Sequence, residues 1–475
     1  MKRAFLVAAL AMFTLACSGS EAAAPAPPAP APAPPPPPPP PAVTPVASVT
    51  IDNAPGEMET GKSRVLTATP KSEAGSALSG RTVAWASNDD AIASVSSTGA
   101  VSAKTPGTAT ITATSEGKSA SVSIKVDTRN GFLTAIVESV RAQYDLPALA
   151  GAIVTRQVGM FGSAVSGRRR ASQSTPVTLN DLWHIGSNLK AITAHVAGIA
   201  VAEGKISWTT TLAEAYPEYA GTMRAEYRNV TLRMLLGHIG GLMANINTIQ
   251  VPAGTLIAQR ANVAMQATAL PPVGNGVGTF TYSNVGYMIA ANMVERAMGT
   301  SWEDIMQQKL LTPLAITSFG WGPTPAATNP IGHQRSGSTW TEWPNSDNAP
   351  VLSAAGRSHW SLEAWGKVIQ DILKADQGQS PLVTQAVAQV NTTSQSSAQY
   401  GSGWYVYANS PWIQGRGVQH DGSNNLNYAR AQLGLDAGVA VMAVTNSHDP
   451  NSTRSNEAMV SMTQKLWAYY MANSN

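Results

Sequence analysis

The chain has 475 residues, of which 43% are hydrophobic and 12% are charged, and its formal net charge at pH 7 is +3. This length gives room for two or three domains with sizeable cores, and the composition excludes disorder over most of the chain. The small net charge excludes a broad basic surface for nucleic acid, and the single cysteine excludes both an intramolecular disulfide and a cysteine-based metal site.

Residues 1–23 have the pattern of an export signal, with a basic start, an apolar stretch and small residues. The only cysteine, Cys17, stands where this pattern resembles the leader of a bacterial lipoprotein, in which cleavage before Cys17 makes it the lipid-bearing N-terminus. Thr14 departs from the leucine that such leaders usually carry, and ordinary secretion with cleavage near residues 22–24 is the alternative. Both interpretations predict an exported protein, periplasmic or at the cell surface, that meets a membrane through a lipid anchor at most.

Residues 24–46 are dominated by proline and alanine. Proline fixes φ and has no backbone donor, so we expect an extended polyproline II linker without a packed core. Behind a lipid-bearing Cys17, such a linker would hold the rest of the chain away from a membrane surface.

The next segment, 47–126, contains seven short stretches of alternating apolar and polar residues, separated by Gly, Asp, Asn and Ser. This pattern predicts a β-sandwich with Trp85 in its core. Residues 82–114 closely resemble the bacterial immunoglobulin-like domain of group 2. The resemblance implies a spacer or an adhesive module on a cell surface, and we interpret Asp89-Asp90 as a turn pair rather than a calcium site.

From 127 to 475 the pattern changes to a mixture of helices and strands. Apolar residues recur at four-residue intervals through 131–144, which predicts an amphipathic helix with Phe132, Ile136, Val140 and Tyr144 in its stripe. The basic cluster Arg168-Arg169-Arg170 is interpreted as a solvated turn between strands, with binding of an acidic surface as the alternative. The remaining expected elements are strands at 149–155, 160–167, 406–415 and 437–446 and a helix at 456–472. Strands at both ends and helices between them predict an α+β domain, whose antiparallel sheet is formed by the two ends and carries a helical lobe.

Ser187-Asn188-Leu189-Lys190 stands at the head of an apolar helical stretch. A serine hydroxyl needs a neighbour that accepts its proton before it can act as a nucleophile. Three residues along a helix a side chain returns to the same face, and burial and the positive helix end both lower the pKa of a lysine, so Lys190 can serve as that base. The same spacing in Ser115-Glu116-Gly117-Lys118 lies between alternating stretches and predicts a polar hairpin turn with its side chains in water.

A second candidate motif is Tyr282-Ser283-Asn284, in a loop that precedes a strongly apolar helix. A phenol whose pKa is lowered by a nearby ammonium can relay protons, and an asparagine amide can hold a substrate carbonyl. Tyr-x-Asn also occurs at Tyr227-Arg228-Asn229 and Tyr407-Ala408-Asn409, but only the copy at 282 has this context.

The third candidate motif is His420-Asp421-Gly422-Ser423, before a strand-like stretch. A small residue beside an edge strand lets backbone N–H groups approach a substrate closely. His184-Ile185-Gly186 and His238-Ile239-Gly240 share the spacing, and we interpret those two histidines as packing or loop residues.

In their order along the chain, the three motifs resemble those of the penicillin-recognising serine hydrolases, in the branch of class C β-lactamases, D-alanyl-D-alanine carboxypeptidases and related esterases. The resemblance covers nearly all of residues 130–475 and is carried also by the stretches LWHIGSNLKAITA, TLRMLLGHIGGL, SAAGRSHWSLEAW and YGSGWYV. It implies no metal and no organic cofactor. The roles it implies are nucleophile for Ser187, shared acid–base work for Lys190 and Tyr282, substrate binding for Asn284 and His420, and an oxyanion hole from the N–H groups of Ser187 and Ser423 beside Gly422.

Two departures from that family matter. Class C β-lactamases carry Lys-Thr-Gly where this chain has His420-Asp421-Gly422, and a histidine that is mostly neutral near pH 7 attracts a substrate carboxylate less than a lysine does. We therefore expect an esterase or D-amino-acid peptidase, with β-lactam hydrolysis as a lesser alternative. The second departure, Ile239-Gly240 where relatives commonly show Thr-Ser, is expected to change only a structural turn.

The sequence thus predicts an exported serine hydrolase that acts on a small-molecule or peptide substrate with an ester or amide bond, peptidoglycan included, and binds no nucleic acid. The alternative is a catalytically inactive surface protein that uses the same fold to bind peptidoglycan or a partner. Whether Lys190 or Tyr282 accepts the first proton from Ser187 stays open at this point.

Overall fold

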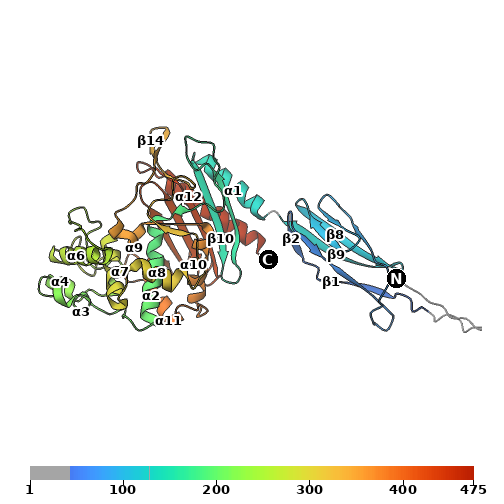
Figure 1. Cartoon of the computed structure of the whole chain (residues 1–475), viewed down its shortest axis with the longest axis horizontal. Coiled ribbons are helices and arrows are strands. Elements are labelled where there is room, and N and C mark those ends of the chain that lie inside the picture. Colours follow the sequence, from blue (N-terminus) through green and yellow to red (C-terminus); the bar gives the residue numbers. More distant parts are fainter. Residues whose placement is uncertain (1–42, 128, 475) are drawn as a thin grey trace, which may run out of the picture.

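The computed structural model describes residues 43–474 except Thr128. The predicted leader with Cys17 and most of the proline-rich linker lie outside the described residues. The described chain forms an all-β N-terminal part and a larger α+β part, which Figure 1 shows joined end to end at the start of helix α1 (Arg129–Gln143).

Residues 43–127 form the predicted sandwich, with two hydrophobic clusters of their own. Its strands pair in three sheets, with the orders β1-β4, β2-β9-β8-β5 and β3-β7-β6. The bounds are β1 Ser48–Asp52, β2 Glu57–Glu59, β3 Ser63–Val65, β4 Thr67–Lys71, β5 Ala84–Ser87, β6 Ala93–Val95, β7 Ala100–Ala103, β8 Gly107–Ser115 and β9 Lys118–Asp127. All seven predicted stretches contain a strand, and Trp85 is partly buried against both clusters.

The second Ser-x-x-Lys copy forms the predicted hairpin turn. Strand β8 ends at Ser115 and β9 begins at Lys118, and the two residues between them have positive φ, as a two-residue hairpin loop requires. Ser115 is buried, however, and its hydroxyl donates to the carbonyl oxygen of Thr82 at 2.8 Å. The expectation that the side chains of this turn lie in water was therefore wrong for Ser115 and is confirmed for Lys118, its exposed partner in the hairpin.

In the larger part, a six-stranded antiparallel sheet joins the two ends of the α+β sequence, as predicted. Its order is β11-β10-β20-β19-β18-β17, so the early strand β10 pairs directly with the late strand β20. The bounds are β10 Ala148–Thr155, β11 Gly159–Gly167, β17 Tyr405–Tyr407, β18 Gly417–Ser423, β19 Tyr428–Gly434 and β20 Val439–Thr445.

Both faces of this sheet are covered, which explains why every residue of β10 is buried. Alternate side chains of a strand point to opposite faces. Leu149 and Ile153 pack with α1 and the closing helix α12 (Arg454–Asn473), whereas Ala150 and Val154 belong to the core shared with the helical lobe. Figure 1 shows α1 and α12 together on one side of the sheet and the lobe on the other.

The lobe is inserted between β11 and β17, and at its centre lies α2, in which twelve of fourteen residues are buried. Within the described residues no helix is long and apolar enough to cross a membrane. The helical elements are η1 Gly186–Asn188, α2 Leu189–Ala202, α3 Leu212–Ala215, η2 Pro217–Tyr219, α4 Ala225–Arg228, α5 Leu232–Leu236, α6 Leu256–Ala269, α7 Asn284–Met298, α8 Trp302–Met306, η3 Gln307–Leu311, η4 Pro350–Leu352, α9 Ser353–Gly356, α10 Leu362–Ala375 and α11 Gln385–Asn391. The short strands are β12 Trp183–His184, β13 Phe319–Trp321, β14 Gly332–Ser336, β15 Thr339–Trp343, β16 Ser358–Trp360 and β21 Ser447–His448.

The helix predicted over 131–144 is confirmed, with Val140 buried and Ile136 and Tyr144 packed against the same cluster. Two details were wrong. Phe132 is 57% exposed, and Leu133 and Val137 complete the buried row instead. The strand expected over 406–415 ends at Tyr407, where β17 stops.

The cluster Arg168-Arg169-Arg170 is a solvated turn only in part, because Arg168 is exposed whereas Arg169 and Arg170 are half-buried and paired. Arg169 makes two hydrogen bonds to the buried carboxylate of Asp181, at 2.9 and 2.6 Å, and Arg170 contacts Glu342. These side chains tie the end of β11 to later loops, because paired guanidinium and carboxylate groups can be accommodated away from water. By contrast, Asp89 accepts backbone N–H groups of its own turn, in agreement with its interpretation as a turn residue.

Candidate active site

The candidate nucleophile and base lie on consecutive helical turns, as the sequence predicted. Ser187 lies in η1, which is one turn of 3₁₀ helix. Lys190 lies in the first turn of α2 and is fully buried. The Lys190 ammonium donates to the Ser187 hydroxyl oxygen at 3.0 Å, to Asn284 Oδ1 at 2.7 Å and to the carbonyl oxygen of Ala355 at 2.6 Å.

All three acceptors of the Lys190 ammonium are uncharged. Burial without a compensating carboxylate lowers the pKa of Lys190 well below its ordinary value. The ammonium also lies 4.9 Å from the centre of the Tyr282 ring, a contact that only partly offsets the lost hydration. Lys190 therefore sheds its proton more readily than a lysine in water, and it stands within hydrogen-bond reach of Ser187.

Tyr282 and Asn284 come from the loop and first turn of α7. Ser283 caps this helix, because its hydroxyl accepts the Gly286 N–H at 2.9 Å and donates to the Met243 carbonyl at 2.6 Å. The cap turns the side chains on either side of Ser283 toward Ser187 and Lys190. The tyrosines of the other two Tyr-x-Asn copies, Tyr227 and Tyr407, do not line the cavity. The buried Tyr227 hydroxyl donates a hydrogen bond to the Gly241 carbonyl oxygen at 3.0 Å.

The protonation of Tyr282 differs from the expectation. Burial raises the pKa of Tyr282, and a hydrogen bond with Ser187 offsets only part of that rise. The Lys190 ammonium does not bring the phenol into its ionised range. Tyr282 therefore stays protonated at neutral pH, where it can pass on a proton but holds no charge.

In the third motif, the backbone rather than the histidine reaches the site. A Cβ on Gly422 would lie 2.0 Å from the Ile185 carbonyl oxygen and 2.7 Å from the Ser187 amide nitrogen. Strand β18 thus packs directly against the nucleophile turn, and only a glycine fits there. Ser423 follows on the wall of the cavity, with its hydroxyl bonded to His448 Nδ1 at 2.9 Å.

His420 is buried behind this wall and does not line the cavity. Its Nε2 is 3.0 Å from the Tyr400 hydroxyl. Burial, with a smaller contribution from Lys190, lowers the pKa of His420 to about 3. His420 therefore lies beside Tyr282, with ring centres 6.4 Å apart, but it does not reach the cavity to which Ser187, Tyr282, Asn284 and Ser423 contribute.

The hydroxyl of Ser187 lies in the wall of a cavity of about 290 Å³. Helix α7, the α9 segment, strand β18 and the loops before and after them contribute to its wall. The lining residues are Ser187, Ala244, Asn245, Tyr282, Asn284, Asn348, Leu352, Ala355, Gly356, Ser423, Asn424 and Asn425.

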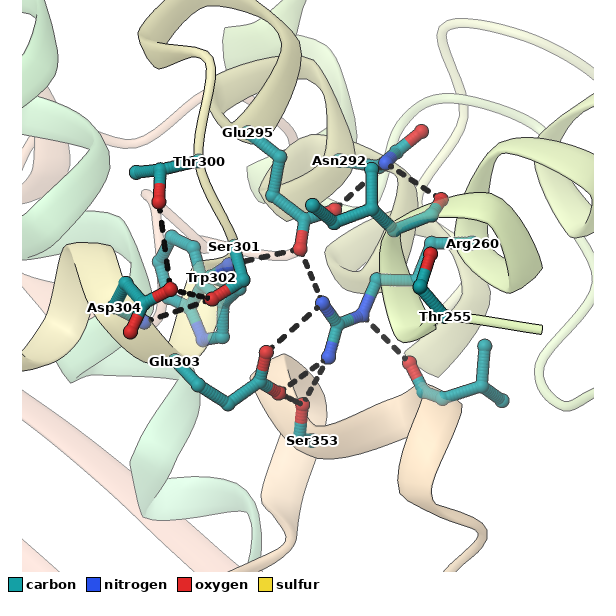
Figure 2. Close-up of polar contacts among 12 residues, drawn as sticks. Thr255, Arg260, Asn292, Glu295, Thr300, Ser301, Trp302, Glu303, Asp304 and Ser353 are labelled. Carbon is teal, nitrogen blue, oxygen red and sulfur yellow. Dashed lines mark hydrogen bonds and ion pairs between the residues drawn. The ribbon is translucent and has the colours of Figure 1, made fainter.

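Residues 353–356 were among the stretches that carry the family resemblance, but we predicted no role in the site for the segment 350–356, which supplies the Ala355 carbonyl to Lys190. Figure 2 shows the cluster that holds it: the buried guanidinium of Arg260 binds Glu295, Glu303 at 2.5 Å and the Ser353 hydroxyl at 2.6 Å. Arg260 Nε also donates to the Val351 carbonyl at 3.3 Å. A backbone carbonyl has no sequence signature, but a fully buried arginine with two glutamates does mark a structural clamp.

His184 was predicted to be a packing residue, and its ring in fact links the nucleophile turn to the cavity wall. Its Nδ1 accepts the Gly186 N–H at 3.2 Å, and its Nε2 lies 2.9 Å from Asp347 Oδ2. Asp347 Oδ1 accepts the Asn424 amide at 3.1 Å. His238 braces the other side, because its Nδ1 accepts the Ser283 N–H at 3.0 Å. In the described residues no group of three or more histidine, cysteine or acidic side chains is arranged to hold a metal ion.

Comparison with known proteins agrees with this arrangement. A family model described as Beta-lactamase matches residues 133–461, and one described as Bacterial Ig-like domain (group 2) matches residues 45–126. Penicillin-binding protein 4 of Amycolatopsis lactamdurans is 25% identical over 335 residues, which is 65% of this chain and 83% of that protein.

Solved structures share the fold. D-amino acid amidase from Ochrobactrum anthropi SV3 superposes with a TM-score of 0.59 at 16% identity, over 73% of this chain and 99% of that one. A β-lactamase from Sulfitobacter sp. EE-36 superposes with a TM-score of 0.57 at 18% identity, over 72% and 99% of the two chains.

Proposed function

Because the chain belongs to the beta-lactamase family, we propose that it is a serine hydrolase that cleaves an ester or amide bond through an acyl-serine intermediate. The observation that carries this proposal is the fully buried Lys190 ammonium 3.0 Å from the Ser187 hydroxyl oxygen, at the wall of a cavity. A lysine without a carboxylate partner at this position has little structural value, because its burial is costly. As a base for Ser187, the same lysine has a chemical role.

In the proposed reaction, Ser187 Oγ loses its proton to Lys190 and attacks the substrate carbonyl. The N–H groups of Ser187 and Ser423 would stabilise the oxyanion, which is worth about 3 kcal/mol per donor. Tyr282 would pass a proton to the leaving group as the intermediate collapses, and water would then release the acyl group. The lowered pKa of Lys190 and the raised pKa of Tyr282 support Lys190 as the first base.

The direct test is the mass of the intact protein after exposure to a fluorophosphonate and, separately, to a fluorescent penicillin. We expect one adduct on Ser187 with the fluorophosphonate, no adduct in Ser187→Ala, and an unchanged adduct in Ser115→Ala, which removes the serine of the other Ser-x-x-Lys copy. A protein that is folded but labelled by neither probe would contradict the proposal and favour the non-catalytic binding protein.

We further propose that the protein is exported and anchored by a lipid on Cys17. The proposal rests on the leader-like sequence before Cys17 and on the proline-rich stretch that follows it. In a bacterial host, mass spectrometry of the mature N-terminus should find a lipid-modified Cys17, and Cys17→Ser should release the protein from the membrane fraction. A mature N-terminus near residues 22–24 would instead indicate ordinary secretion.

A further inference from the structure

The wall of the cavity beside Ser187 carries no formal charge. None of its twelve lining residues, all of them in the described part of the chain, is acidic, basic or a histidine. Its polar surface comes instead from two serines, one tyrosine and five asparagines: Asn245, Asn284, Asn348, Asn424 and Asn425.

The basic groups nearest to this wall are committed elsewhere. Lys190 is buried and donates to three protein acceptors. His420 is buried with its Nε2 at hydrogen-bond distance from the Tyr400 hydroxyl, and its pKa of about 3 keeps it neutral at pH 7. Arg357 adjoins the lining residue Gly356, but its Nε donates to the Asn348 carbonyl at 2.8 Å and its guanidinium end packs on Gly322. His448 Nδ1 is bonded to the Ser423 hydroxyl at 2.9 Å, and burial lowers the pKa of His448. None of these four residues lines the cavity, so the lining presents no cation to a substrate carboxylate.

One acid, Asp347, stands directly behind the wall of the cavity, paired with His184. Asp347 precedes the lining residue Asn348 and bonds the amide of the lining residue Asn424 at 3.1 Å. Burial alone would raise the pKa of Asp347, but His184 and the hydrogen bonds from Asn348 and Asn424 lower it below its ordinary value. The carboxylate therefore stays ionised at neutral pH, and its direct partner is His184 Nε2 at 2.9 Å, so it supplies no cation to the cavity.

Several asparagine groups on the wall retain hydrogen-bonding capacity. Asn284 uses one amide proton on Asn245 Oδ1 at 2.7 Å and keeps the other. Within the described residues, Asn348 Oδ1 and the side-chain amide of Asn425 have no hydrogen-bond partner. A wall of free amide donors and acceptors matches the N–H and C=O groups of another amide, whereas an anion would find donors without a compensating charge.

We propose that the substrate portion held in this cavity is an uncharged amide-bearing group, so that the preferred substrates are neutral peptide-like amides or esters rather than substrates with a carboxylate beside the scissile bond. The proposal rests on the proposed function and specifies its substrate class. It separates this site from one that selects β-lactams or peptides ending in a free D-amino acid, both of which present a carboxylate there.

Two matched substrate pairs test the proposal on the full chain. The ester pair is 4-acetoxybenzamide and 4-acetoxybenzoate, and the amide pair is N-acetyl-D-alanyl-D-alaninamide and N-acetyl-D-alanyl-D-alanine. In each pair we expect kcat/KM to be about tenfold or more higher for the neutral member, because a desolvated carboxylate without a cation is strongly disfavoured. Equal values, or a preference for the anion, would overturn the proposal.

The rate at which a fluorophosphonate labels Ser187 gives a measurement that does not need turnover. The neutral member of each pair should slow labelling at lower concentration than the anionic member, and the reverse order would overturn the inference. These outcomes leave the proposed function intact, because Ser187 is labelled in all of them. Absence of labelling and of turnover would instead contradict the proposed function.

A charge placed on the wall should shift the selectivity. Asn425 is exposed with φ of 66°, so Asn425→Lys and its control Asn425→Gln carry the same backbone strain and differ in charge. Relative to Asn425→Gln, Asn425→Lys should raise the ratio of kcat/KM for 4-acetoxybenzoate to kcat/KM for 4-acetoxybenzamide by about fivefold or more. An equal effect on both substrates would overturn the inference.

Discussion

At the scale of single residues, the chemistry of this site depends on one ammonium group placed out of water. Lys190 is fully buried and its three bonded acceptors are neutral, so the protein stabilises the charged form poorly. Burial lowers the pKa of Lys190 well below its ordinary value, so this lysine loses its proton more readily than a lysine in water. The neutral amine can then accept the proton of the adjacent Ser187 hydroxyl, which lies 3.0 Å away.

Lys190→Arg tests whether proton acceptance, and not positive charge alone, is required at this position. A guanidinium keeps its proton under all ordinary conditions, so we expect kcat/KM to fall by about a thousandfold or more. Circular dichroism and thermal melting of Lys190→Arg and of Lys190→Met would check that both variants are folded. Near-normal activity in a folded Lys190→Arg protein would contradict the assignment of Lys190 as the base.

The pH dependence of kcat/KM follows from the same groups. Activity needs neutral Lys190, so kcat/KM should rise with pH, with its midpoint below the ordinary lysine value of 10.5. Activity also needs protonated Tyr282, whose raised pKa moves any alkaline decline above the ordinary tyrosine value of 10.0. Initial rates at low substrate concentration from pH 5 to 10 would measure the profile, and activity that falls with pH over this range would contradict it.

At the scale of elements, the site depends on a short segment held by a distant helix. Helix α6 contributes Arg260, whose guanidinium joins α7, α8 and the α9 segment through Glu295, Glu303 and Ser353. The α9 segment then presents the Ala355 carbonyl to Lys190. The clamp visible in Figure 2 is therefore part of the support of the site, although it lies outside the cavity.

Arg260→Met should lower the free energy of unfolding by about 3–5 kcal/mol, because it leaves Glu295 buried without its cation. The control is Arg224→Met, which removes an ion pair with Glu226 whose side chains are 41% and 45% exposed, and should cost at most about 1 kcal/mol. Urea unfolding monitored by fluorescence gives both values. Equal effects for the two variants would show that the clamp does not stabilise the fold.

The contact between β18 and the nucleophile turn permits no side chain at Gly422. Gly422→Ala places a methyl group 2.0 Å from the Ile185 carbonyl oxygen, so the strand or the turn must shift, and we expect a loss of about tenfold or more in kcat/KM. Gly221→Ala is the matched control, because nothing lies within 4 Å of its Cβ and its φ is ordinary. Full activity in Gly422→Ala would exclude the close approach of these two backbones.

At the scale of the whole molecule, residues from the two ends of the α+β sequence meet at one site. The nucleophile turn η1 comes soon after β10 and β11 in the chain. Ser423 is the last residue of β18, which belongs to the C-terminal part of the sequence, and both segments lie at the same sheet. The N-terminal sandwich has its own hydrophobic clusters, and no cluster contains buried residues from both parts. The candidate active site and the sandwich thus belong to two separate cores.

Removal of residues 1–128 should therefore leave the activity of the remaining chain within about twofold of that of the full chain, since the site and its core lie entirely after residue 132. Steady-state kinetics on one substrate would measure this. A large loss of kcat/KM in a folded truncated protein would mean that the sandwich contributes to the site.

Much of this protein could be inferred from local patterns alone. Alternation over 47–126 and the return of strands near the end predicted both folds, and one helical turn of spacing brought Ser187 to Lys190, because these relations depend on backbone periodicity. Tertiary structure decided what periodicity does not encode. The burial of His420, the raised pKa of Tyr282, the Ala355 carbonyl and the uncharged wall all depend on which surfaces pack together. Desolvation by those surfaces is the main cause of the shifted pKa values of Lys190, Tyr282 and His420.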